Sequence, residues 1–140
     1  MTIPYTGGCA CGAIRYECTA EPLMMFHCHC RDCQRATGGP YVSAVIVAAD
    51  SFRLTQGTPR FHASESLAGG YHNRGFCENC GSPVMAKGDG PLSFVGVHAA
   101  SLDDPSWFRP KMYIFANDKQ PWAQLDASLP EFREYMPFNK

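Results

Sequence analysis

The sequence predicts a mainly β protein that forms a single domain over residues 1–140. Short runs rich in β-branched and aromatic residues recur along the chain, and turn-forming residues separate them. The 11 prolines and 13 glycines of the chain supply many of these turn residues. Long helical periodicity is absent, and we find no internal repeat, linker or low-complexity segment that would divide the chain further.

The first predicted strand, Ala13–Cys18, alternates well, because Ile14, Tyr16 and Cys18 fall on one face and charged residues on the other. Cys18 is therefore expected to be a buried free thiol and not a metal ligand. Similar runs predict further strands at Val42–Ala48, Phe52–Thr55, Arg60–Ala63, Tyr71–Phe76, Val84–Ala86, Leu92–Val97 and Met112–Phe115.

Two short helices are also predicted. One turn of helix should run from Asp32 to Thr37 and end at the glycine pair that follows. A second should begin at Ser128, since Glu131 stands at the spacing of a capping box, and should stop before Pro137.

The cysteines are the most informative residues for function. Seven of the eight lie in three tight clusters: Cys9-Ala-Cys11, Cys28-His-Cys30-Arg-Asp-Cys33 and Cys77-Glu-Asn-Cys80. Four thiolates close a tetrahedral zinc site, whereas three leave one coordination position open for water or substrate. Disulfides are the alternative, but CxC and CxxC pairs are poorly placed for long-range cross-links. A chain of this length also buries enough surface on folding to be stable without disulfides. The pattern predicts one structural and one reactive metal.

The local geometry indicates how the sulfurs divide. In an extended segment Cys28 and Cys30 point to the same side while His29 points away, and a turn through Arg31-Asp32 can bring Cys33 back to them. Alternation likewise gives Cys9 and Cys11 a common side. We therefore assign the structural ion to Cys9, Cys11, Cys77 and Cys80, and the open, catalytic ion to Cys28, Cys30 and Cys33.

Two alternatives stay open at these sites. Iron also binds four cysteines, although nothing else in the sequence indicates electron transfer and zinc is favoured. The second ion could take a histidine as fourth ligand, from His62, His72 or His98, each of which also fits a core or surface role. His27 and His29, on the side away from the sulfurs, are expected to pack or to support the ligands.

These motifs resemble the glutathione-dependent formaldehyde-activating enzyme family, whose domain is shared with the centromere protein V family. The resemblance covers nearly the whole chain and is carried by Gly8–Tyr16, Cys28–Cys33, Thr37–Gly38, Gly75–Ser82, Ser101–Pro105 and Pro121–Trp122. It implies the β-tent fold, a mostly antiparallel arrangement of sheets, with two zinc ions, one on each of the two cysteine sets assigned above. It also implies glutathione and formaldehyde as substrates.

One segment departs from the family pattern. Many members carry a histidine after the Asp-Asp-Pro stretch, where this chain reads Lys111-Met112-Tyr113-Ile114-Phe115. If that histidine helps to bind substrate, this chain handles a different one.

Charge and hydropathy exclude several other functions. Lys plus Arg number 12 against 13 Asp plus Glu, so the formal net charge is −1 and the totals give no basis for nucleic-acid binding. The longest apolar stretch, Tyr41–Ala49, is too short to span a membrane. The start of the sequence has neither the basic segment nor the apolar run of a signal peptide, and together with reduced cysteines this predicts a cytoplasmic protein.

Two functions from different classes follow from these features. The first is a zinc-dependent carbon–sulfur lyase or synthase that holds a substrate thiol as thiolate and adds it to an aldehyde. The second is a non-catalytic zinc-folded module that binds a thiol or a protein partner. Arg15, Arg35 and Lys87 could engage the carboxylates of glutathione, although each also fits a structural or solvated charge.

Overall fold

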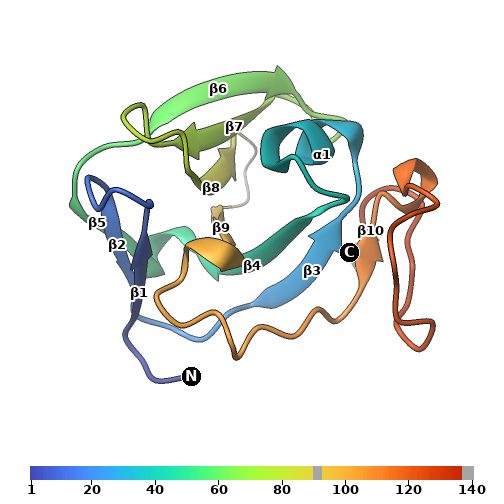
Figure 1. Ribbon diagram of the computed structural model, residues 1–140, viewed down its shortest axis with the longest axis horizontal. Helices are drawn as coiled ribbons and strands as arrows, with labels where there is room; N and C mark the ends of the chain where they lie inside the picture. Colours follow the sequence, from blue (N-terminus) through green and yellow to red (C-terminus); the bar gives the residue numbers. More distant parts are fainter. Residues whose placement is uncertain (90–92, 137–140) are drawn as a thin grey trace. The chain divides into compact units, whose positions relative to one another are not determined.

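The computed structural model describes residues 1–89 and 93–136. The chain divides into two compact units, both discontinuous in sequence. Unit 1 contains Met1–Met24 and Val45–Phe108, and unit 2 contains Met25–Ala44 and the residues from Arg109 onward. The chain passes from unit 1 to unit 2 within β3 (Met24–Cys28) and returns to unit 1 within β4 (Val42–Ala48). It passes to unit 2 again after Phe108 (Figure 1).

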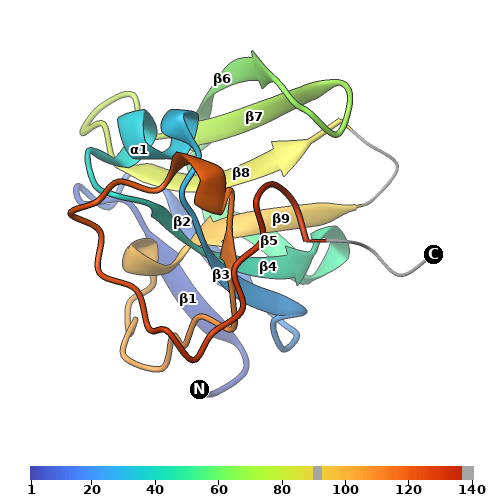
Figure 2. The same cartoon turned by 90° about the vertical axis from the view of Figure 1, so that its right-hand side faces the viewer.

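Unit 1 contains two sets of antiparallel strands. A three-stranded sheet has the order β1-β2-β5, and a second run of paired strands has the order β9-β8-β7-β6, in which successive strands lie side by side (Figure 2). The bounds are β1 Tyr5–Gly8, β2 Arg15–Cys18, β5 Phe52–Gln56, β6 Arg60–Glu65, β7 Tyr71–Phe76, β8 Pro83–Gly88 and β9 Phe94–His98. Two 3-10 helices, η1 at Ala49–Ser51 and η2 at Ala99–Ser101, follow β4 and β9.

The core of unit 1 follows from the alternation of its strands. Tyr16 and Cys18, on the same face of β2, are both 0% exposed, and so are Val84 and Val97 from β8 and β9. Burying such apolar side chains stabilises the unit by roughly 1.5–3 kcal/mol each. Cys18 is a buried free thiol, as predicted, and its surroundings raise its pKa to about 11, mainly through burial.

Unit 2 combines a parallel strand pair with one helix. β3 pairs in parallel with β10 (Tyr113–Ile114), so that Tyr113 lies opposite His27 and Ile114 opposite Cys28. The helix α1 spans Arg31–Thr37 and ends at Gly38, whose left-handed conformation (φ 73°) suits glycine. A 3-10 helix, η3, spans Ala116–Asp118. Cys28, Cys33 and Ile114 form the buried core of the unit, with partly buried apolar side chains such as Phe26 and Phe132 packed against them.

Most predicted elements are present. The strands at 42–48 and 71–76 have the predicted bounds, and those at 52–55, 60–63 and 84–86 extend by one to three residues. Leu92, at the start of another predicted strand, lies outside the described residues, and that strand is observed at Phe94–His98. The first helix begins one residue earlier than predicted. The pairing is mostly antiparallel, as expected, and β3 with β10 is a parallel pair.

The second predicted helix, from Ser128, was wrong within the described residues. Instead of capping a helix, Ser128 donates its backbone N–H and its hydroxyl to the carboxylate of Asp126, at 2.9 and 2.6 Å. The segment that follows is extended and bonds to the region of β10. Phe132 N–H donates to the Tyr113 carbonyl at 2.8 Å, and Tyr113 N–H donates to Pro130 at 3.0 Å. These long-range bonds outcompete a local capping pattern. Pro137 lies outside the described residues.

Candidate metal sites

The structure brings four sulfurs of unit 1 together. The Sγ atoms of Cys9, Cys11, Cys77 and Cys80 all lie within 4.8 Å of one another. Cys9 follows β1, and Cys77 and Cys80 occupy the turn between β7 and β8. In that turn Gly81 adopts φ 79°, a conformation that suits glycine, and its N–H donates to the Cys77 carbonyl at 2.7 Å.

The spacing of these sulfurs fits a tetrahedral zinc ion. A Zn–S bond of about 2.3 Å requires sulfurs about 3.8 Å apart in a regular tetrahedron. The Cys9–Cys11 and Cys11–Cys77 sulfurs are 3.6 and 3.8 Å apart. None of the eight cysteines, all of which lie in the described residues, forms a disulfide, so this structure does not support the disulfide alternative.

Hydrogen-bond donors next to this group favour the negatively charged thiolate form of its cysteines. The Ile14 N–H donates to Cys9 Sγ at 3.2 Å, and the Asn79 side-chain amide donates to Cys11 Sγ at 3.3 Å. The Ser82 hydroxyl lies 3.2 Å from Cys80 Sγ, and hydrogen bonds from Ser82 lower the pKa of Cys80 to about 5. Such contacts stabilise thiolates and orient them toward a cation. Asn79 and Ser82 were not identified from the sequence as partners of the sulfurs.

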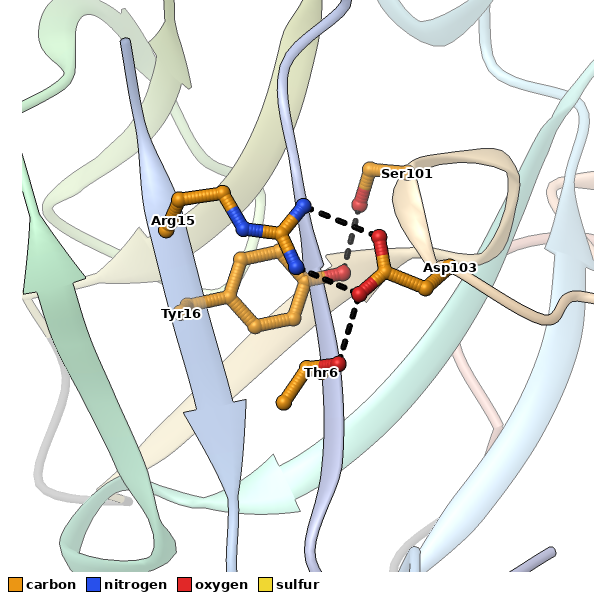
Figure 3. A network of polar contacts seen from close by, with 5 residues as sticks. All are labelled: Thr6, Arg15, Tyr16, Ser101 and Asp103. Carbon is orange, nitrogen blue, oxygen red and sulfur yellow. Dashed lines mark hydrogen bonds and ion pairs between the residues drawn. The ribbon is translucent and has the colours of Figure 1, made fainter. Parts of the chain in front are cut away.

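A polar network anchors the strand next to this site (Figure 3). Arg15 forms a two-point ion pair with Asp103, which also accepts a hydrogen bond from Thr6 at 2.6 Å. These contacts, led by Arg15, lower the pKa of Asp103 to about 2. The Tyr16 hydroxyl lies 2.7 Å from the Ser101 hydroxyl. Arg15 also interacts electrostatically with Cys9, so it offsets part of the negative charge that four thiolates would carry. These contacts fit the structural role considered for Arg15.

The second sulfur group lies within unit 2. The Sγ atoms of Cys28, Cys30 and Cys33 all lie within 4.8 Å of one another, and Cys28 and Cys33 are each 6% exposed. Cys30 is the N-cap of α1, and its sulfur accepts a hydrogen bond from Cys33 N–H at 3.2 Å. The first turn of α1 thus returns Cys33 to the end of β3. The contacts of Cys28 with Cys30 and Cys33, and then its burial, raise its pKa, so three thiolates here require a cation.

The histidines beside this group are packing residues, as predicted. His27 stacks on Tyr41 with ring centroids 3.8 Å apart, and His29 meets Tyr41 and Tyr113 edge to face at 5.1 and 5.7 Å. Burial is the main cause that lowers the pKa of both histidines, to about 4 for His27. Among the described residues neither sulfur group includes a histidine.

Gln34 supports the loop that carries the second group. Its side-chain amide donates to the His29 carbonyl at 2.6 Å and to the Asp118 carbonyl at 3.0 Å. Its carbonyl oxygen accepts from Gln120 at 3.2 Å and from Arg31. Gln34 is 5% exposed and joins α1 to the segment around η3. No sequence pattern pointed to this role, because it depends on where the distant residues Asp118 and Gln120 lie in the fold.

Fold and sulfur geometry together define a class: a mainly β protein with one four-cysteine and one three-cysteine group, each suited to a metal ion. Residues 4–118 match the family model described as glutathione-dependent formaldehyde-activating enzyme, and the chain belongs to this family.

A crystal structure of a Rhodobacter sphaeroides protein, a structural-genomics target, is similar in fold. The TM-score is 0.56 at 18% identity, over 90% of this chain and 98% of that one. At this identity the likeness concerns the fold alone. Across the described part of the chain, no helix is long and apolar enough to cross a membrane.

Proposed function

We propose that the protein is a zinc-dependent carbon–sulfur lyase or synthase that acts on a small thiol adduct. The most direct reaction is the formation of S-hydroxymethylglutathione from glutathione and formaldehyde, which the family membership supports. The observation that carries the proposal is the group Cys28, Cys30 and Cys33, because three sulfurs leave one position of a tetrahedral zinc ion open.

In this proposal Cys28, Cys30 and Cys33 hold the catalytic zinc, and Cys9, Cys11, Cys77 and Cys80 hold a structural zinc. Zinc would lower the pKa of a substrate thiol that binds at the open position, so that the sulfur reacts as a thiolate. The overall reaction is an addition: a carbon–sulfur bond forms, and the thiol proton ends on the former carbonyl oxygen. It needs no oxidant, reductant or leaving group.

The chain's own residues position this chemistry. The N-cap bond from Cys33 N–H to Cys30 Sγ fixes the first turn of α1, and Gln34 holds the preceding loop through the His29 carbonyl. A donor set of three thiolates is electron-rich, which makes zinc a weak Lewis acid. It therefore favours delivery of a thiolate over activation of water, and a lyase over a hydrolase.

The same proposal includes the wider organisation of the protein. We propose a single domain of the β-tent type, because both units are discontinuous in sequence and the chain passes between them repeatedly. The free cysteines support a cytoplasmic location. The partner would be a small thiol, and neither nucleic acid nor a membrane is expected.

One observation favours the alternative, a non-catalytic zinc-folded module that binds a thiol or a protein partner. Cys28 and Cys33 are each 6% exposed, so most of their surface is closed to solvent. Against this alternative, Cys30 is only half-buried, so a ligand can approach the sulfur group from the side of Cys30.

Cobalt-substituted protein distinguishes the two functions. Titration with glutathione should change the visible spectrum of the cobalt, and NMR should show exchange of formaldehyde with its glutathione adduct above the uncatalysed rate. Cys30→Ser should bring exchange to background while Ser still caps α1. Cys18→Ala, at the thiol outside both groups, should keep both responses. No spectral response to glutathione would refute the enzyme and favour the module.

A further inference from the structure

The strand β6 leaves one edge of its sheet open. It is the last strand in the order β9-β8-β7-β6, in which it pairs with β7 (Figure 2). Across the described residues no strand pairs with the far edge of β6. Five of its six residues, all but Ser64, are exposed, so no other part of the chain covers this edge. An open strand edge offers N–H and C=O groups to another strand.

The hairpin that joins β6 to β7 fixes the direction in which the β6 backbone points. The Ser66 N–H donates to the Gly70 carbonyl at 3.0 Å, and the Asp89 N–H donates to the Tyr71 carbonyl at 3.2 Å. Position 66 therefore bonds toward β7, whereas the Tyr71 backbone bonds away from β6. Glu65, which lies opposite Tyr71, consequently has its own backbone groups on the open edge.

Three residues of β6 share this outward direction, because backbone groups alternate along a strand. Counting back from Glu65 in steps of two gives Ala63 and Phe61. The side chains of these three residues also lie on one face of the sheet. The open edge thus presents a short, symmetric set of hydrogen-bonding groups centred on Ala63, whose small side chain lets another strand come close.

Two opposite charges stand on this same face. Lys87 of β8 lies in the row of Asn73 and Ala63, and its ammonium lies over the Phe61 ring, 4.8 Å from the centroid. Glu65 ends the strand, two rows further along. Among the described residues neither Glu65 nor Lys87 forms an ion pair. The edge therefore has a positive charge beside Phe61 at one end and a negative charge at the other.

We propose that β6 is a dimerisation edge, to which a second copy of this chain adds its own β6 in antiparallel orientation. With Ala63 opposite Ala63 of the second copy, Phe61 lies opposite Glu65 of the second copy, and all three outward residues are paired. Directly opposite residues share a face. The Glu65 carboxylate of each copy then lies beside the Lys87 ammonium over the other copy's Phe61, which gives two identical ion pairs.

The symmetry of the edge favours a second copy over an unrelated strand, because a two-fold axis at Ala63 brings each charge to its opposite. Neighbouring registers lack this match. A shift of the axis by one residue in one direction sets Glu65 opposite Pro59, which has no N–H to donate. The opposite shift sets Phe61 against Leu67, in the turn beyond the strand.

Sedimentation equilibrium of the purified 140-residue chain tests the dimer. Its mass should rise from 15.4 kDa toward twice that value as concentration increases. Glu65→Lys and Lys87→Glu should each weaken association roughly tenfold or more, because both ion pairs become like-charge contacts. Glu21→Lys, the same charge change at an exposed residue outside the strands, is the matched control and should leave association unchanged.

Mixing the two charge variants tests the register itself. An equimolar mixture of Glu65→Lys with Lys87→Glu should associate as strongly as the unchanged chain, since every contact between the copies again joins opposite charges. A charge that acted only within its own chain would give no such recovery.

Backbone pairing has a readout of its own. Ala63→Pro removes the central outward N–H and should abolish the dimer, while the bonds from β6 to β7 remain because this N–H points away from β7. In the unchanged chain, protection of the Phe61, Ala63 and Glu65 amides from hydrogen exchange should increase with protein concentration. If Ala63→Pro does not fold, the mixing experiment still decides.

A chain that stays monomeric at every concentration would overturn the proposal, and the edge would then belong to another partner or to none. A dimer that survives both charge reversal and Ala63→Pro would place the interface elsewhere. Weakened single variants that do not recover on mixing would refute the register. The edge contains none of the cysteines, so these outcomes do not depend on the proposed metal chemistry.

Discussion

The two cysteine groups should differ in what they contribute to folding, and single serine substitutions test this. Cys11 and Cys77, with sulfurs 3.8 Å apart, are 66 residues apart in sequence, so a metal on this group closes a long loop. Cys28, Cys30 and Cys33 lie within six consecutive residues. Loop-closure entropy grows as (3/2)RT ln n, which makes the long closure worth about 2 kcal/mol more than the short one.

Local structure adds to this difference. Cys30→Ser removes a proposed ligand of the second group but leaves a favourable N-cap for α1. Cys77→Ser removes a proposed ligand that is 2% exposed between β7 and β8, and no other residue there would restore the link to Cys9 and Cys11. We therefore expect Cys77→Ser to lower the free energy of unfolding by at least about 2 kcal/mol more than Cys30→Ser. Cys30→Ala, which also removes the cap, should cost about 1 kcal/mol more than Cys30→Ser.

Urea unfolding followed by circular dichroism measures these differences, and elemental analysis measures the metal content of the same samples. The unchanged protein should contain close to two zinc ions per chain, and Cys30→Ser close to one. Equal losses of stability in Cys77→Ser and Cys30→Ser, or a larger loss in Cys30→Ser, would refute the distinction between a structural and an open site.

Two further predictions concern the strand beside the four-cysteine group. A Cβ at Gly7 would overlap the Tyr16 hydroxyl and the Ser101 carbonyl, so Gly7→Ala should cost about 3 kcal/mol in urea unfolding. Gly39→Ala is the control, because its φ is not positive and its Cβ would meet only the Thr37 hydroxyl at an ordinary 3.8 Å; it should change stability by less than about 1 kcal/mol. Similar values for both variants would contradict the reasoning. Asp103→Asn should lower the free energy of unfolding by at most about 1 kcal/mol, because its ion pair with Arg15 is partly exposed. A larger loss would contradict the view that the pair stabilises only the strand that carries Arg15.

The sequence predicted those parts of the fold that depend on local pattern. Runs of strand-forming residues between turn residues identified β4, in which Ala44, Val45 and Val47 are buried, and β7. It missed β1, whose sequence Tyr5-Thr-Gly-Gly8 has low strand propensity. This strand forms because a glycine at position 7 lets the backbone pass close to Tyr16 and Ser101, a tertiary contact that no local pattern contains.

The same difference between local pattern and tertiary contact decides which parts of the candidate sites were predictable. The three-sulfur group was predictable because an extended pair and one turn suffice to bring Cys28, Cys30 and Cys33 together. The donors Asn79 and Ser82 were not, since their positions depend on how distant turns meet.

Tyr113 gives a physical account of the segment that departs from the family pattern. It is 4% exposed, it pairs with His27 across β3 and β10, and its hydroxyl accepts a hydrogen bond from Asp126 N–H at 2.7 Å. The side chain is therefore committed to joining β10 to the segment that follows it. A residue so engaged is poorly suited to contact a substrate directly.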